Sequence, residues 1–226
     1  MYNTIMKALF FGGTGTISTA ISQYIMQQGW ELYLLNRGNR NAVIDAGNTA
    51  GKVVEITCDI REDSVETIRS KLQAAIGKGQ RFDIVADFIV FSVDHVSKDY
   101  AIFKDLCDQY IFISSASAYQ KPLSSYLITE STPLANPYWE YSRNKIACEE
   151  FLTARYRENG FPITIVRPSH TYDERSVPLG VHGAKGSWQV IKRMLEGKPV
   201  IIHGDGTSLW TMTHNSDFAR AFAGLM

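Results

Sequence analysis

The chain has 226 residues, of which 45% are hydrophobic and 20% charged, and its formal net charge at pH 7 is zero. These values are typical of a globular protein with one sizeable domain and a small appendage, and they argue against disorder. The charges form no long run of one sign, so we expect neither a nucleic acid nor an acidic membrane surface as a partner.

The sequence contains no run with the length and flanks of a signal peptide or a membrane span, so we expect a soluble, cytoplasmic protein. Cys58, Cys107 and Cys148 are far apart and have neither CxxC spacing nor histidines at ligand distance. They predict reduced thiols and no metal site.

Apolar segments rich in β-branched and aromatic residues alternate with helical patterns along most of the chain. The predicted strands span 7–11, 31–35, 53–57, 82–91, 110–114 and 162–166. Apolar residues at helical spacing predict helices across 17–25, 65–76 and 100–106, and a long one across 138–159. This alternation predicts an α/β fold with a Rossmann-type, doubly wound parallel sheet.

The pattern changes in the loops and in the last quarter of the chain. Residues 117–137 are rich in Ser, Pro and polar side chains and predict an active-site loop. Beyond Pro168 we expect a short helix at 187–196, a short strand around 200–203 and a final helix containing Phe218 and Phe222. We therefore divide the chain into a dinucleotide-binding domain, 1–168, and a partial substrate-binding lobe, 169–226, interleaved with it.

A glycine turn lies directly between the first predicted strand and the first predicted helix. Gly13 and Gly15 would let the backbone bend sharply and approach a pyrophosphate, and Ser18 would let helix and strand pack closely. The unpaired N–H groups at the helix start would attract the phosphates. A tight turn without a ligand is the alternative. The predicted contacts with a dinucleotide here are Gly12, Gly13, Thr14, Gly15, Thr16 and Ile17.

The end of the second predicted strand bears on the choice of cofactor. NAD sites usually carry an acid there, whereas this chain has Asn36 and Arg37. A guanidinium suits a 2′-phosphate, so NADP is favoured over NAD, unless Arg37 is a solvated loop charge. Asp59 and Ile60 follow the third strand, where an adenine ring would lie, although a helix-capping Asp59 beside a buried Ile60 would give the same pattern.

Tyr141 and Lys145 are four residues apart in the long predicted helix, so their side chains share one face. Ser115 lies near the carboxyl end of a predicted strand, where α/β folds bind ligands. A phenol has a pKa of about 10, so a nearby ammonium and an oxidised nicotinamide would be needed to make it a base near neutral pH. We expect Tyr141 to transfer the proton, Lys145 to tune it and hold the ribose, and Ser115 to bind the reacting oxygen.

Segments 12–17, 112–119, 141–145 and 165–168, taken together and in this order, closely resemble the extended short-chain dehydrogenase/reductase family, of the NAD-dependent epimerase/dehydratase type. The resemblance covers nearly the whole chain and implies that Ser115, rather than Ser114 or Ser117, is the catalytic serine. It brings the residues after Pro168 near nicotinamide and substrate, and it implies a homodimer paired through the helices around Tyr100 and Tyr141. We add Phe91 and Pro168 to the cofactor contacts, and we take Ser117, His170 and Trp210 as substrate contacts.

Three departures from the family pattern narrow the chemistry. Ala116 and Ser117 stand where 4,6-dehydratases carry an Asp-Glu pair, which disfavours dehydration. Trp210 stands where nucleotide-sugar epimerases place an arginine on the diphosphate, which disfavours that substrate. The chain also ends soon after Asp217, so that either the substrate lobe is small or the sequence is part of a longer one.

The motifs together predict an enzyme, an NAD(P)-dependent oxidoreductase or epimerase that acts at a secondary alcohol or ketone carbon of a small, carbohydrate-like molecule. The alternative is a catalytically silent dinucleotide sensor or an RNA-binding module on the same fold. The presence of Tyr141, Lys145 and Ser115 favours the enzyme.

Overall fold

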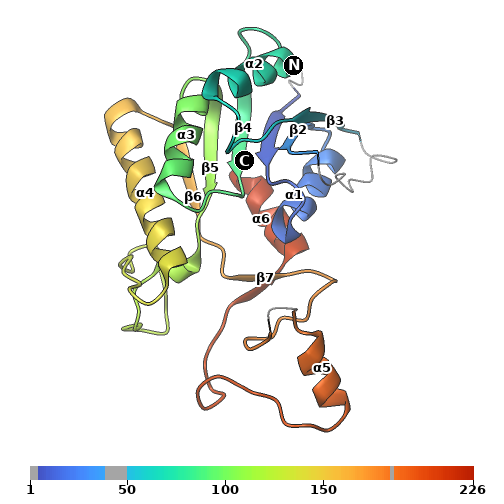
Figure 1. Cartoon of the computed structure of the whole chain (residues 1–226), viewed down its shortest axis with the longest axis vertical. Helices are drawn as coiled ribbons and strands as arrows, with labels where there is room; N and C mark the ends of the chain where they lie inside the picture. Colours follow the sequence, from blue (N-terminus) through green and yellow to red (C-terminus); the bar gives the residue numbers. More distant parts are fainter. Residues whose placement is uncertain (1–4, 39–49, 184–185) are drawn as a thin grey trace.

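Six parallel strands form the central sheet of the computed structural model, which describes residues 5–38, 50–183 and 186–226 (Figure 1). Every neighbouring pair in this sheet runs parallel. In spatial order the strands are β3 (Lys52–Thr57), β2 (Glu31–Asn36), β1 (Lys7–Phe11), β4 (Phe82–Asp87), β5 (Cys107–Ile113) and β6 (Ile163–Val166). This is the order of the doubly wound dinucleotide-binding fold, so the predicted Rossmann-type class is confirmed.

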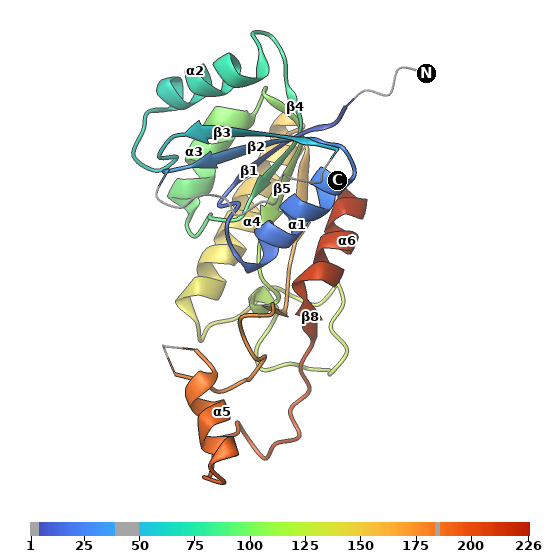
Figure 2. The same cartoon turned by 90° about the vertical axis from the view of Figure 1, so that its right-hand side faces the viewer.

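Helices cover both faces of the sheet (Figure 2). One face packs against α1 (Thr16–Gln27) and α6 (Asn215–Leu225), around Ile21, Ile25 and Phe222. The other face packs against α2 (Val65–Ile76), α3 (Val93–Phe103) and α4 (Glu140–Asn159), which cover a second core cluster. Because β1 and β4 are covered on both sides, they read in the sequence as continuous apolar runs rather than as alternating ones.

Two predicted boundaries in the middle of the chain are wrong. The strand predicted at 82–91 ends at Asp87, whose side chain accepts the Ile89 N–H at 3.0 Å and the Tyr110 hydroxyl at 2.7 Å. This turn takes the next residues out of the sheet and toward the site described below. The third helix begins earlier than predicted, at Val93, because Ser92 caps it by accepting the His95 N–H, and it ends before Leu106.

Between β6 and α6 the chain forms a small lobe beyond the sheet (Figure 2). Here β7 (His170–Tyr172) and β8 (Met212–His214) pair in parallel, an arrangement that was not predicted, and α5 (Trp188–Leu195) is close to its predicted place. The strand predicted around 200–203 is wrong, since these residues form no ladder and Ile201 and Ile202 are exposed. Within the described ranges, no helix combines the length and the apolar character that crossing a membrane requires.

Candidate active site

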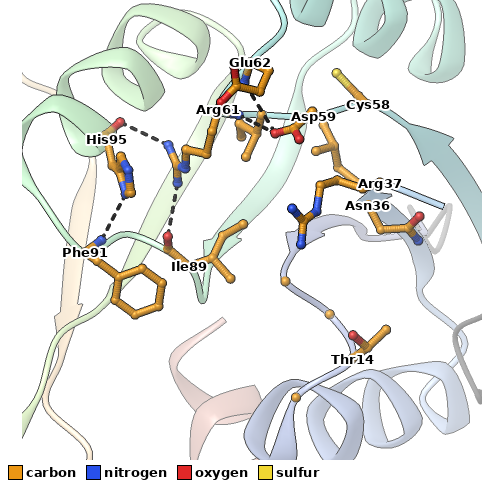
Figure 3. A pocket seen from close by; sticks show the side chains of 15 residues that line it. Thr14, Asn36, Arg37, Cys58, Asp59, Arg61, Glu62, Ile89, Phe91 and His95 are labelled. Carbon is orange, nitrogen blue, oxygen red and sulfur yellow. Dashed lines mark hydrogen bonds between the residues drawn. The ribbon is translucent and has the colours of Figure 1, made fainter. Parts of the chain in front are cut away.

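A pocket of about 540 Å³ opens at the carboxyl edge of the sheet, where β1, β2, β3 and β4 end (Figure 3). Open α/β sheets bind ligands at this edge, where the strand order reverses between β1 and β4. Nine of the predicted cofactor contacts line it: Gly12, Gly13, Thr14, Gly15, Asn36, Arg37, Asp59, Ile60 and Phe91. Residues from four separate loops therefore meet around one cavity.

Gly12 and Gly15 of the glycine turn differ in whether the fold itself requires a glycine. Gly12 has φ +82°, and an added Cβ would lie 2.4 Å from Ile89 Cγ2, so the fold itself requires glycine there. Gly15, in contrast, has φ −87° at the N-cap of α1, and an added Cβ would meet nothing closer than Ser18 Oγ at 3.5 Å. Neither the backbone conformation nor a neighbouring described residue therefore requires a glycine at position 15. A phosphate that approaches the backbone closely would require one.

Ser18, predicted only to let helix and strand pack closely, also fixes the turn through hydrogen bonds. Its buried Oγ donates to the Gly12 carbonyl at 2.8 Å and accepts the Gly15 N–H at 2.9 Å. The serine thereby ties the strand end to the first turn of α1, which leaves the N-terminus of α1 directed at the pocket.

The far wall of the pocket is polar. Figure 3 shows the Arg37 side chain extending into the space between the Asp59 loop and the glycine turn. Asn36 Oδ1 accepts the Gly38 N–H at 2.8 Å, while its Nδ2 is buried without a partner among the described residues. A ligand hydroxyl would satisfy this donor. Asp59 uses Oδ1 to accept the Arg61 N–H at 2.9 Å.

The sequence reasoning missed several residues that shape the pocket, chiefly Arg61 and His95. Arg61 Nη1 donates to both oxygens of buried Asp99 at 2.9 and 3.0 Å, and Nη2 donates to the Ile89 carbonyl at 3.3 Å. Arg61 thus joins the loop after β3 to the loop after β4. Its position directly after Asp59 and Ile60 was a usable signal, but its partner Asp99 lies 38 residues away in sequence.

The pocket residues fit a dinucleotide. The glycine turn and the start of α1 would hold the pyrophosphate, Asn36 and Arg37 the adenosine ribose, and Asp59 and Ile60 the adenine. The orphan Asn36 Nδ2 and the open space at Gly15 are the two observations that support this fit.

Lys145 is almost completely buried, with 2% of its surface exposed, and its ammonium group is anchored by the main chain. Nζ donates to the Val90 carbonyl at 2.6 Å and to the Ile113 carbonyl at 2.7 Å. Burial lowers the pKa of Lys145 to about 8, and the nearby Asp87 carboxyl partly opposes this shift. The ammonium has three N–H groups, so one remains for a ligand.

Tyr141 is half-buried on the same face of α4, with Lys145 Nζ 5.6 Å from the centre of its ring. Burial raises the pKa of the Tyr141 phenol, and a hydrogen bond with Ser115 lowers it in part. The sequence reasoning expected a lowered pKa. The chain alone shifts it the other way because burial outweighs the polar contacts, so a bound positive charge would be needed to activate the phenol.

A chain of serine hydroxyls leads away from Tyr141. Ser115 Oγ lies 2.9 Å from Ser117 Oγ, which accepts a hydrogen bond from Ser142 Oγ at 2.8 Å. Asn136 Nδ2 donates to the Ser117 carbonyl at 2.7 Å and closes the loop over the start of α4. Ser117, predicted to contact substrate, therefore holds Ser115 in place through these bonds.

The pocket and the predicted catalytic residues meet at Phe91. This side chain lines the pocket, its ring centre lies 6.5 Å from that of Tyr141, and Lys145 Nζ lies 5.2 Å from it. Tyr141, Lys145 and Ser115 do not line the pocket themselves. Tyr141 and Lys145 lie beside Phe91, at the border of the pocket.

The remaining predicted contacts lie outside the pocket. The Thr16 carbonyl accepts a hydrogen bond from Asn215 Nδ2 at 3.2 Å, and Ile17 packs against the core under α1. The Pro168 carbonyl accepts the Ala116 N–H at 2.9 Å, beside Ser115. In the lobe, the His170 and Trp210 rings pack together with centres 4.8 Å apart. Among the described residues, no three His, Cys, Asp or Glu side chains gather as a metal ion would require.

Comparison with known proteins places the chain in a family. Residues 8–226 match the model of the NAD dependent epimerase/dehydratase family. The chain belongs to this family. The family is one of enzymes, so the predicted resemblance and the prediction of an enzyme are confirmed at this level.

Two relatives show the range of chemistry in the family. The chain is 26% identical to a putative UDP-glucose 4-epimerase of Methanocaldococcus jannaschii, over 94% of this chain and 71% of that protein. It is 22% identical to the 2′-dehydrokanamycin reductase of Streptomyces kanamyceticus, over 98% of this chain and 58% of that protein. One is named an epimerase and the other a reductase.

Solved structures of the family share the fold. The UDP-glucuronic acid 4-epimerase of Bacillus cereus, in complex with UDP-glucuronic acid and NAD, matches with a TM-score of 0.69 and 21% identity. That match covers 97% of this chain and 73% of the other. The UDP-glucose 4-epimerase of Thermotoga maritima, with UDP-glucose, also has a TM-score of 0.69, at 20% identity over 98% and 73% of the two chains.

Proposed function

We propose that this chain carries out NAD(P)-dependent oxidation, reduction or epimerisation at a secondary alcohol or ketone carbon of a carbohydrate-like substrate. The position of Phe91 carries the proposal, because its ring joins a pocket with the features of a dinucleotide site to Tyr141 and Lys145. The family assignment and the two relatives, which are an epimerase and a reductase, support it.

In this mechanism the Tyr141 phenol takes the proton from the substrate hydroxyl, or returns it to the carbonyl oxygen. The Ser115 hydroxyl binds the same oxygen and is held by Ser117. Lys145 places its remaining N–H toward the cofactor ribose while the two main-chain carbonyls fix its position. A bound nicotinamide supplies or accepts the hydride.

Replacing Tyr141 by Phe tests the function. We expect turnover to fall by about 10²- to 10⁴-fold, because general acid-base catalysis is lost, while dinucleotide affinity is unchanged. UDP-glucose, UDP-glucuronic acid and 2′-dehydrokanamycin form the substrate panel, with reduced nicotinamide followed by absorbance and the sugar products separated by chromatography. An epimerase keeps its nicotinamide through turnover, whereas a reductase releases it. A wild-type chain that binds dinucleotide or RNA but converts no alcohol or carbonyl compound would be the silent binding module instead.

For the choice of cofactor, we propose NADP over NAD. Arg37 lines the pocket directly after Asn36, and no acid ends β2. Arg37→Ala should weaken NADP binding roughly tenfold, the equivalent of one charge-assisted hydrogen bond, and leave NAD binding unchanged. Calorimetric titration of both dinucleotides measures this. Arg81→Ala, which removes an exposed partner of Asp108 away from the pocket, is the control. Equal losses for both dinucleotides would contradict the preference.

We propose that the lobe after Pro168 forms the substrate side of the site, with His170 and Trp210 as contacts. We also propose that the protein forms a homodimer through α3 and α4. A third proposal is that it binds no nucleic acid. The zero net charge supports the last point. The homodimer rests on family resemblance, and sedimentation of the chain at several concentrations measures it.

A further inference from the structure

Trp139 is an exposed tryptophan beside the proposed proton donor. It precedes α4 by one residue, 55% of its surface is exposed, and its ring centre lies 4.8 Å from that of Tyr141 with an angle of 39° between the rings. Phe91 lies near the same phenol, 6.5 Å from its ring centre. Two aromatic side chains thus neighbour Tyr141.

The helix does not explain this tryptophan. Trp139 is the N-cap residue of α4 and makes no side-chain hydrogen bond to the first turn. In the same chain, Ser64 caps α2 and Ser92 caps α3, each by accepting a backbone N–H. Serine, threonine and asparagine are preferred at this position, and large apolar residues are disfavoured. A local rule broken without a local gain is typical of a functional position.

An indole face offers flat apolar surface, and the CH groups on one face of a sugar ring provide a matching surface. We infer that Trp139 is a specificity-determining residue that stacks on the ring of the carbohydrate substrate while the reacting carbon of that ring faces Tyr141. This inference rests on the proposed function. The proximity of the indole to the phenol identifies the ring: the group within reach of both is the reacting sugar rather than a distant base or phosphate.

The lobe is consistent with such a substrate. Trp210, which stands where the family resemblance implies an arginine, packs on His170, and its ring centre lies 5.8 Å from that of His203. A site with exposed indoles and without that arginine selects for sugar surface rather than for phosphate charge.

Trp139→Ser separates binding from stability, because serine is a good N-cap. We expect the KM for the converted carbohydrate to rise about three- to tenfold, the range of one aromatic contact, with the KM for the dinucleotide unchanged and Tm equal or higher. Trp139→Phe should retain most of the affinity. Tyr138→Ser is the matched control, since Tyr138 is the neighbouring aromatic, 76% exposed, and no ring contact joins it to Tyr141 among the described residues.

Four results would overturn the inference. A lower Tm of Trp139→Ser with parallel losses of carbohydrate and dinucleotide affinity would show that Trp139 is a structural residue. A lower sedimenting mass for Trp139→Ser would show that Trp139 lies in a contact between two subunits. An unchanged carbohydrate KM would remove it from the site. If the wild-type chain converts nothing in the panel, the proposed function fails. Calorimetric binding of the same panel to wild type and Trp139→Ser then decides the stacking role separately, and equal or absent binding rejects it.

Discussion

At the scale of single residues, Lys145 couples the site to pH. Its folded pKa of about 8 lies below the ordinary 10.5, so between these values the unfolded chain binds more protons and stability rises with pH. Buried thiols act in the opposite direction over an overlapping range, as burial raises the pKa of Cys148 from 9.0 to about 11. The effect of Lys145 is therefore measured as the difference in free energy of unfolding between wild type and Lys145→Met.

We expect the free energy of unfolding of wild type to rise by up to about 3 kcal/mol relative to that of Lys145→Met as pH rises from about 8 to about 10.5. Urea unfolding at several pH values measures this difference. Parallel stability curves for the two proteins would show that Lys145 is not held at a lowered pKa. Lys71→Met is a suitable control, because Lys71 lies on α2 and bonds the Thr57 carbonyl, away from Tyr141.

Site residues with a local signal could be predicted from the sequence, whereas residues whose roles depend on distant partners could not. The pair Tyr141 and Lys145 could be placed on one face from helical spacing alone, and Arg37 from its position after a strand. The roles of Arg61 and Ser117 could not, because their partners Asp99 and Ser142 are distant in sequence. The raised pKa of Tyr141 likewise depends on burial, which no local pattern encodes.

At the scale of elements, the two glycines of the turn between β1 and α1 are expected to affect different properties, Gly12 the stability of the fold and Gly15 the affinity for the dinucleotide. Gly12→Ala places a Cβ against Ile89 at positive φ and should destabilise the protein by about 1–3 kcal/mol. Gly15→Ala meets no close neighbour, so it should cost at most about 1 kcal/mol, because alanine is a poorer N-cap than glycine, while its dinucleotide affinity falls about tenfold or more.

Thermal unfolding and dinucleotide titration of both variants test this difference. Gly224→Ala in α6, where an added Cβ meets nothing within 4 Å, controls for the substitution itself and should leave affinity unchanged. Unaltered dinucleotide binding by Gly15→Ala would remove the start of α1 from the phosphate site.

The alternation of strands and helices was predictable because apolar runs and helical spacing are local properties. Element ends were less so. The apolar run at 82–91 continues past the sheet, and only the Asp87 side chain, bonded to Ile89 and Tyr110, ends the strand. The apolar run at 200–203 predicted a strand, but it has no neighbouring strand to pair with. The pairing of β7 with β8 joins segments about forty residues apart and gave no local signal.

At the scale of the whole molecule, the sheet and the lobe differ in how much apolar surface they bury. The inner strands are buried on both faces, whereas α5 has no buried residue and Leu195, Ile201 and Leu209 are largely exposed. Segments with few buried apolar contacts open at low free-energy cost. We therefore expect amides in 177–183 and 186–211 to exchange with solvent at an opening free energy at least about 2 kcal/mol below that of β1, β4 and β5.

Hydrogen exchange followed by mass spectrometry measures this difference, and α6 provides an internal control. It lies still later in the chain, but Ala219 and Phe222 are buried against α1, and Asn215 bonds the Thr16 carbonyl. If burial governs opening, α6 is protected while the lobe exchanges. If exchange follows distance from the chain end, α6 exchanges first. Added dinucleotide should protect the loops at Gly12 and Asp59 and leave 177–183 and 186–211 unchanged, because those described residues do not line its pocket.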